Sequence, residues 1–298
     1  MPAAVNYWMG YTGLIYLVAG LLLLRKELAA ARGREKLIAL GPVFIAASLA
    51  VFAPEHFRGP QFVADMVPRW MPAHLFWAYF VGAALLAAAT SLVLRKCVGL
   101  SSTLLGLMFF LFVALLYLPS AMRHPHGRFV WSYALRDLSF CAGAWALAGL
   151  HGVAAAPRPS RALIRFGRLV FAVAALFYAA EHFLHPEFAP GVPLELVSPS
   201  WVPFPRVLGY GAGAILLVAG LHLALNRKTR IAAAAIGALM TALTLGLYLP
   251  ILVAAHVGSV DAVNDALNYV ADTLLYGGAA LALAAALPRD RAPEPAAS

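Results

Sequence analysis

Nine stretches of predominantly apolar sequence, each about 20 residues long, run through this chain and limit what it can fold into. A helix of about 20 residues rises roughly 30 Å, which matches the hydrocarbon thickness of a bilayer. We therefore expect an all-α, polytopic membrane protein with about nine transmembrane helices. The expected spans are 7–24, 37–54, 73–94, 100–122, 129–151, 163–184, 205–225, 231–255 and 262–287.

Composition supports lipid as the solvent for these helices. Of the 298 residues, 62% are hydrophobic and only 12% are charged, against about 25% charged residues in a soluble domain. The first stretch is followed, and not preceded, by the basic pair Arg25 and Lys26. A signal peptide needs its basic residues in front, so we interpret 7–24 as a retained span.

The charges are distributed unevenly between the loops. Sixteen of the 22 basic residues, but only four of the 13 acidic residues, follow the odd-numbered spans. The positive-inside rule makes these loops cytoplasmic, which predicts an outside N-terminus and a cytoplasmic C-terminus in a bacterial inner membrane. The net charge of +9 is then a topology signal. We expect the bilayer as a partner and no nucleic acid, which would require a concentrated basic face.

The chain also repeats itself. Three motifs occur twice in the same order: Glu55-His56-Phe57 with Glu181-His182-Phe183, Trp70-Met71-Pro72 with Trp201-Val202-Pro203, and Tyr117-Leu118-Pro119 with Tyr248-Leu249-Pro250. From the Trp motif to the Pro motif the offset between the copies is constant, and after a small shift Asp137 matches Asp272 and Gly143 matches Gly278. Pro119 and Pro250 predict kinks near the ends of their spans.

Each copy holds four spans, an even number, so the two copies should share one orientation about an axis along the membrane normal. We expect two parallel four-helix bundles side by side. The domains follow: 1–36 is an N-terminal transmembrane helix with a basic cytoplasmic loop, 37–156 is the first repeat, 157–288 is the second repeat, and 289–298 is a cytoplasmic tail.

Charged groups inside a membrane are costly and are often functional. Asp272 lies 15 residues from Leu287 at the inner edge, or roughly 22 Å along a helix. Asp137 and Glu181 fall at a similar depth, and Glu55 lies nearer the outer edge. The outer third therefore collects six candidates for handling protons, which are Glu55, His56, Asp137, Glu181, His182 and Asp272.

Four aromatic residues are candidates for ligand binding beside this polar site: Trp70, Trp201, Tyr117 and Tyr248. Alternatively, Trp, His and Glu at helix ends are interfacial anchors. Arg136 could equally be a structural partner of Asp137. His182 and His185 could share a helix face, but neither HExxH nor paired cysteines occur, so we predict no metal site, and no cofactor is visible in the sequence.

The segment Trp70-Met71-Pro72-Ala73-His74-Leu75-Phe76-Trp77, with Gly82-Ala83-Ala84-Leu85-Leu86 and the basic turn Arg95-Lys96, resembles the DoxX-like family of small four-span bacterial membrane proteins. The resemblance implies a membrane location, a link to quinone redox chemistry and a respiratory or redox partner in the membrane. It transfers no catalytic residue. The fused double repeat and the extra first span differ from the usual single four-span unit.

Three functions stay open at this point. The first is an accessory to quinone-linked redox chemistry that meets a quinone near the outer face. The second is a membrane carrier, because parallel repeats and intramembrane carboxylates are features of transporters. The third is a non-catalytic scaffold that binds a partner through glycine-lined faces, such as those of Gly82 and Gly213. Whether the protein is an enzyme is not decided by the sequence.

Overall fold

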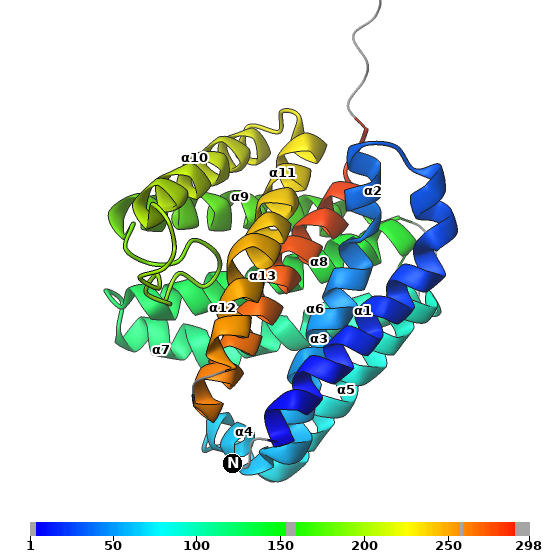
Figure 1. Cartoon of the computed structure of the whole chain (residues 1–298). Coiled ribbons are helices and arrows are strands. Elements are labelled where there is room, and N and C mark those ends of the chain that lie inside the picture. Colours follow the sequence, from blue (N-terminus) through cyan, green and yellow to red (C-terminus); the bar gives the residue numbers. More distant parts are fainter. Residues whose placement is uncertain (1–3, 153–158, 257–258, 290–298) are drawn as a thin grey trace, which may run out of the picture.

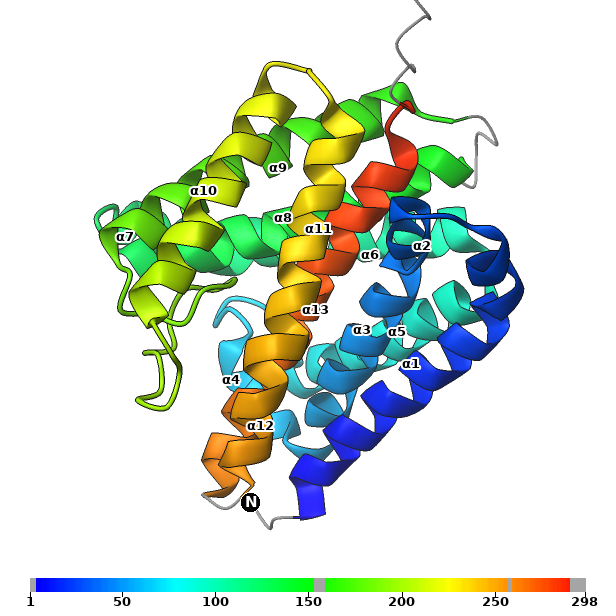
Figure 2. The same cartoon turned by 45° about the horizontal axis from the view of Figure 1, so that its top comes forward.

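The computed structural model describes residues 4–152, 159–256 and 259–289, and within them the chain forms helices and no β-strand (Figures 1 and 2). The predicted tail beyond Arg289 and the predicted boundary at 156 between the repeats lie outside the described residues. The first repeat and the segment before it comprise α1 (Ala4–Ala30), α2 (Arg34–Ala39), α3 (Gly41–Arg58), α4 (Pro60–Met66), α5 (His74–Leu94), α6 (Val98–Phe112), the π-helix η1 (Val113–Tyr117), α7 (Leu118–Arg123) and α8 (Arg128–His151). The second repeat comprises α9 (Arg161–Leu184), α10 (Pro205–Ala224), α11 (Thr229–Leu243), the π-helix η2 (Thr244–Tyr248), α12 (Leu249–Ala255) and α13 (Val260–Ala286).

The expectation of an all-α polytopic membrane protein is confirmed. Among the described residues, eight helical segments are long and apolar enough to cross a bilayer: Tyr7–Ala30, Arg34–Arg58, His74–Leu94, Val98–Arg123, Arg161–Leu184, Pro205–Ala224, Thr229–Ala255 and Val260–Ala286. The remaining expected span, 129–151, is the 24-residue helix α8. It is long enough to cross, but Arg128, Arg136 and Asp137 reduce its apolar character. It depends on neighbouring helices to cover those charges.

The internal repeat is visible in the backbone, at the same constant offset that separates Trp70 from Trp201 in the sequence. Helix α11 begins and ends at the positions equivalent to the two ends of α6, and η2 occupies the positions equivalent to η1. The non-glycine residues with positive φ, between 48° and 58° among the described residues, also fall into three pairs at this offset: Ala73 with Phe204, Arg95 with Asn226, and Cys97 with Lys228. The two copies therefore share their helix starts and turns.

The two π-helices have a common local cause. Each ends at a tyrosine, two residues before Pro119 or Pro250. A proline inside a helix lacks the N–H for the bond to the carbonyl four residues earlier, and its ring crowds that carbonyl. A single π turn shifts the hydrogen-bond register just before the proline. The predicted kinks are thus accommodated as π turns at equivalent places in both copies.

The repeats are not two closed bundles side by side, as the sequence suggested. The last helix of each repeat packs along the first helix of the other repeat as extensively as along a helix of its own, so that α8 lies along both α6 and α9, and α13 lies along both α11 and α3. Helices α8 and α13 also contact each other, and both views show α13 between α3 and α11 (Figures 1 and 2). The repeats are therefore interleaved, with α8 and α13 at the centre.

Small residues permit this central packing. A Cβ atom added to Gly143 on α8 would lie 2.4 Å from Cβ of Ala279 on α13. One added to Gly278 would lie 2.9 Å from the carbonyl oxygen of Gly41 on α3. Lipid tails are as apolar as the helix surfaces, so the hydrophobic effect does not drive helices together inside a bilayer. Helices in lipid associate through close packing contacts of this kind instead. The sequence motifs give the order of the spans along the chain, whereas these glycines allow α13 to pack closely on α8 and α3.

We predict that Gly143→Ala destabilises the protein by about 1–3 kcal/mol, because the added methyl group overpacks the contact between α8 and α13. Gly211→Ala on α10 is the matched control, since no atom lies within 4 Å of its added Cβ atom. Thermal unfolding in detergent measures both. Equal unfolding temperatures for the two variants would contradict the close contact at Gly143.

Candidate functional site

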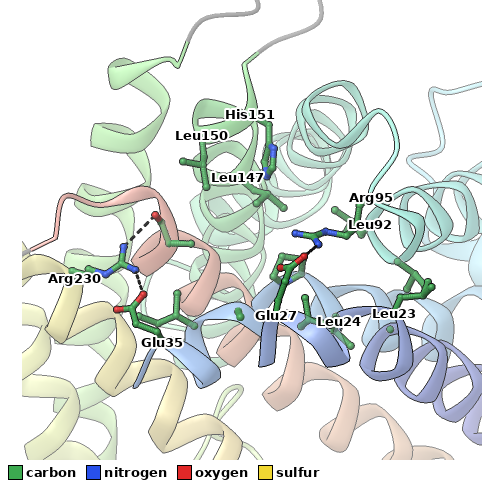
Figure 3. Close-up of a pocket in the computed structure, with 17 residues that line it drawn as sticks. Leu23, Leu24, Glu27, Glu35, Leu92, Arg95, Leu147, Leu150, His151 and Arg230 are labelled. Carbon is green, nitrogen blue, oxygen red and sulfur yellow. Dashed lines mark hydrogen bonds and ion pairs between the residues drawn. The ribbon is translucent and has the colours of Figure 1, made fainter. Parts of the chain in front are cut away.

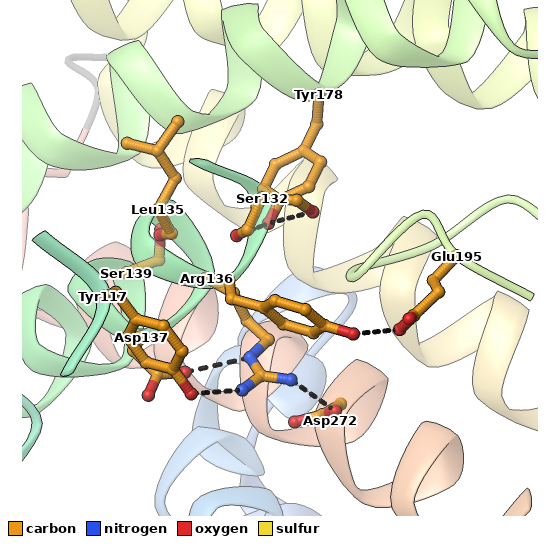
Figure 4. Close-up of polar contacts among 10 residues, drawn as sticks. Tyr117, Ser132, Leu135, Arg136, Asp137, Ser139, Tyr178, Glu195 and Asp272 are labelled. Atoms are coloured by element: carbon orange, nitrogen blue, oxygen red, sulfur yellow. Dashed lines mark hydrogen bonds and ion pairs between the residues drawn. The ribbon is translucent and has the colours of Figure 1, made fainter. Parts of the chain in front are cut away.

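Arg136 on α8 binds a carboxylate from each of the two repeats (Figure 4). Arg136 Nε donates to Oδ1 of Asp137 at 2.9 Å, and Nη1 donates to Oδ2 of Asp272 at 2.8 Å. Its Nη2 lies 3.5 Å from the hydroxyl of Tyr117. The two carboxylates are only 4% and 7% exposed. We call Arg136, Asp137, Asp272 and Tyr117 the arginine cluster.

The structure corrects the residue matching between the repeats in their last helices. The ring pairs Tyr117–Tyr133 and Tyr248–Tyr269 have the same geometry, with centroids 6.1 Å apart and planes at 24°. Tyr133 and Tyr269 are therefore equivalent, and counting onward from each of them places Asp272 at the position of Arg136. The sequence match was shifted by a single position and paired Asp272 with Asp137. Equivalent positions thus carry a base in one copy and an acid in the other, and they bind each other.

The charges of the arginine cluster do not balance. One guanidinium faces two carboxylates, so the cluster carries one excess negative charge when both are ionised. An uncompensated charge buried among apolar side chains is costly. A proton or a small cation on one carboxylate would remove the excess. This imbalance makes the cluster a place where a proton or cation can be bound and released.

A loop reaches the cluster from the second repeat. The Tyr133 hydroxyl donates to Glu195 in the connection between α9 and α10 (Figure 4). Arg136 lies over the Tyr133 ring, with its Cζ 5.1 Å from the ring centroid. One end of α8 also holds this loop, because Arg128 Nη2 donates to the Leu194 carbonyl at 2.8 Å. Movement of the loop would therefore change the surroundings of the arginine cluster.

Glu181 and His182 lie in the last turn of α9, where the same loop begins, and have different bonding partners. Glu181 accepts a 2.6 Å bond from Arg128 Nε and is almost fully buried. His182 is fully buried, with Nδ1 2.6 Å from the Tyr178 carbonyl and Nε2 accepting from the Gly191 N–H at 3.1 Å. Because Nε2 accepts, Nδ1 carries the proton and donates. Both nitrogens are occupied, which favours a structural role for His182.

Glu55 and His56 lie outside the arginine cluster. Glu55 lies beside the side chain of Asn268 on α13, one turn from Asp272 on the same helix. His56 Nδ1 lies 3.2 Å from the Phe52 carbonyl. In the described part of the chain, neither side chain makes a hydrogen bond to Arg136. Glu55 is thus a neighbour of the cluster along α13.

Of the four predicted ligand-binding aromatics, Tyr117 alone is part of the cluster. Its counterpart Tyr248 is buried under the loop, where a Cβ atom on Gly191 would lie 2.5 Å from the Tyr248 hydroxyl. Trp70 and Trp201 are 71% and 49% exposed in the connections that precede α5 and α10. Exposure at helix ends suits interfacial anchors.

Sequence reasoning gave too little weight to several residues of this site. Arg136 was considered only as a partner of Asp137, although a base in an apolar stretch is as costly as an acid and is as strong a signal. Tyr133 and Glu195 carried no motif that could have identified them. In the described ranges, no group of three or more His, Cys, Asp or Glu residues is placed to hold a metal ion.

Comparison with known proteins adds one partial match. A family model described as a domain of unknown function, DUF8561, matches residues 45–136, from α3 to Arg136 on α8. No curated protein matches the chain, and no solved structure matches it. The match covers most of the first repeat and none of the second.

We predict that Arg136→Gln destabilises the protein by about 3–5 kcal/mol, because two buried carboxylates lose their partner. Adding Asp137→Asn and Asp272→Asn to the same chain should recover most of this loss, since the buried charges are then removed. Thermal unfolding of the single and triple variants in detergent makes the measurement. A triple variant that is no more stable than Arg136→Gln would contradict the charge pairing.

Proposed function

We propose that this chain is a proton-coupled membrane carrier in which the arginine cluster binds and releases the coupling proton. The observation that carries the proposal is the sharing of one partly buried arginine by two buried carboxylates from opposite repeats. The excess carboxylate provides the proton site. Asp272 is its centre, because its bond to Arg136 crosses between the repeats and has to break when α8 and α13 shift against each other.

The place of the cluster supports this function. In carriers built from repeats, coupling ions bind at the interface between the repeats, and transport moves one repeat against the other. The cluster joins α8 to α13, the last helices of the two copies. Protonation of Asp272 would weaken its attraction to Arg136. The charge state of one side chain would thus be linked to the relative position of the repeats.

The π-helices are a second supporting feature. Single π turns inside α-helices often mark functional sites, because they leave backbone groups free to rearrange. Here η1 ends at Tyr117, which contacts Arg136. Its counterpart η2 ends at Tyr248 under the loop. The irregular turns thus adjoin the central pair of helices in both repeats.

The test uses purified protein in sealed liposomes that contain a pH-sensitive dye. Pools of small carboxylic acids, amino acids and sugars are added outside, and the internal pH is recorded. We predict that at least one pool drives proton movement and that Asp272→Asn slows it by about a hundredfold, as expected when a proton-transferring group is lost.

Asp261→Asn, at the exposed start of the same helix, is the matched control and should behave as the wild type. Proton movement at the wild-type rate in Asp272→Asn would exclude the cluster as the coupling site. An absence of proton movement with every pool would count against a carrier.

The second candidate is the accessory to quinone-linked redox chemistry. It is favoured by the donors beside the carboxylates: the phenol of Tyr117 and the guanidinium of Arg136 could both donate to a quinone carbonyl. The DoxX-like resemblance points the same way. Quinone reduction takes up protons with electrons, which the carboxylates could supply. Because no redox centre is visible in the sequence, the electrons would come from a membrane partner.

For this candidate we predict that protein purified in mild detergent retains added menaquinone and that Tyr117→Phe lowers retention about tenfold, the value of one good hydrogen bond. Tyr248→Phe is the control, because it removes the equivalent hydroxyl from the other repeat. Native mass spectrometry measures the bound quinone. Equal retention by the two variants would rule out a quinone at the arginine cluster.

A further inference from the structure

A second site lies at the other end of the helices. A cavity of about 300 Å³ opens where α1, α5 and α8 end and where α2 and α11 begin (Figure 3). Leu147 and His151 of α8 line it, whereas Arg136 stands 11 residues earlier on that helix, or roughly 16 Å away. The cavity is therefore separate from the arginine cluster.

The lining of this cavity has two chemical parts. Its wall consists of aliphatic side chains, including Leu23, Leu24, Leu92, Leu147 and Leu150. Charged side chains stand at its rim, where Arg95 pairs with Glu27 and Arg230 pairs with Glu35 (Figure 3). A hydrocarbon wall below an ionic rim suits a ligand with an apolar chain and a charged head.

Arg230 makes one side of the cavity rigid. Its Nη1 donates to the carbonyls of Ala284 and Leu287 at 2.7 and 3.1 Å, and its Nη2 donates to Oε2 of Glu35 at 2.7 Å. These bonds satisfy carbonyls at the end of α13. The Nε of the same side chain is buried and has no partner among the described residues. A buried donor without a partner is costly.

The other arginine is free to change partners. Arg95 and Glu27 have side chains 52% and 51% exposed, so their ion pair lies in water and can open at little cost. The two segments beside the cavity, 25–36 and 95–96, carry two acidic residues, Glu27 and Glu35, against seven basic ones: Arg25, Lys26, Arg32, Arg34, Lys36, Arg95 and Lys96. The surroundings of the rim are therefore strongly positive and attract an anion.

We propose that this cavity binds one anionic phospholipid from the adjacent leaflet. The phosphodiester of the headgroup lies on Arg95 at the rim, and part of one acyl chain lies against the leucine wall. Basic pockets between membrane helices select anionic headgroups in this way. A free phosphate ion shares the headgroup chemistry but makes no use of the leucine wall, so a change to the wall separates the two.

The test reconstitutes the full chain with equal amounts of phosphatidylglycerol and phosphatidylcholine, extracts it in mild detergent and counts bound lipids by native mass spectrometry. The wild type should retain one phosphatidylglycerol in preference to phosphatidylcholine. Arg95→Gln should lower that retention about tenfold, the value of one charge-assisted hydrogen bond. Arg227→Gln is the matched control, because it removes an exposed basic residue from the α10–α11 turn, outside the cavity.

A second variant tests the acyl-chain part. Leu23 lines the cavity and is exposed, so Leu23→Trp can fill the entrance without burying a new side chain in the core. We expect the same loss of phosphatidylglycerol as with Arg95→Gln. Retention at the wild-type level in Leu23→Trp would overturn the proposal, as would equal retention of the two lipids or an equal loss in Arg227→Gln.

Discussion

A guanidinium in the apolar interior of a helical membrane protein has to be paired, and the pairing of Arg136 organises the centre of this molecule. Its two carboxylate partners come from its own helix and from α13 of the other repeat. Helix α8 therefore has to lie where α13 can reach it, in contact with α6, α9 and α13. This requirement explains why α8, the least apolar of the long helices, is packed between other helices. A purely apolar helix could have faced lipid.

The two repeats use one backbone for different chemistry. Tyr117 and Tyr248 end equivalent π-helices and stack on equivalent tyrosines with the same geometry. Yet the Tyr117 hydroxyl meets Arg136, whereas the Tyr248 hydroxyl is covered by the loop that His182 holds. Duplication thus supplied two copies of a scaffold, and the polar groups diverged on it. The arginine cluster occurs once in the described part of the molecule and lies where the two repeats meet.

The sequence predicted the membrane class, the positions of the helices and the repeat because those features depend on local composition and on rare motifs such as Tyr-Leu-Pro. It did not predict the interleaving. The motifs give the order of the spans along the chain. That α13 packs on α3 as well as on α11 depends on contacts such as Gly278 against Gly41. Because glycine is common in this chain, the sequence does not single out the glycines that make these contacts. The one-residue error in matching Asp272 had a similar cause, because the Ala-rich sequence around it allowed two alignments. The stacked tyrosines decide between them.

The interleaving has a consequence for how the proposed carrier could work. Because α8 packs on α9 and α13 packs on α3, each repeat holds the last helix of the other. The repeats cannot separate as independent rigid bundles, so any opening at the arginine cluster has to occur by sliding or tilting of α8 against α13. Close contacts such as Gly143 against Ala279 keep the two helices together beyond the cluster. Arg136 precedes Gly143 by about two turns of α8, so the bond between Arg136 and Asp272 lies to one side of that contact and is the one that such a tilt stretches. Protonation of Asp272 would lower the cost of that movement, which connects the charge imbalance of the cluster to the geometry of the whole fold.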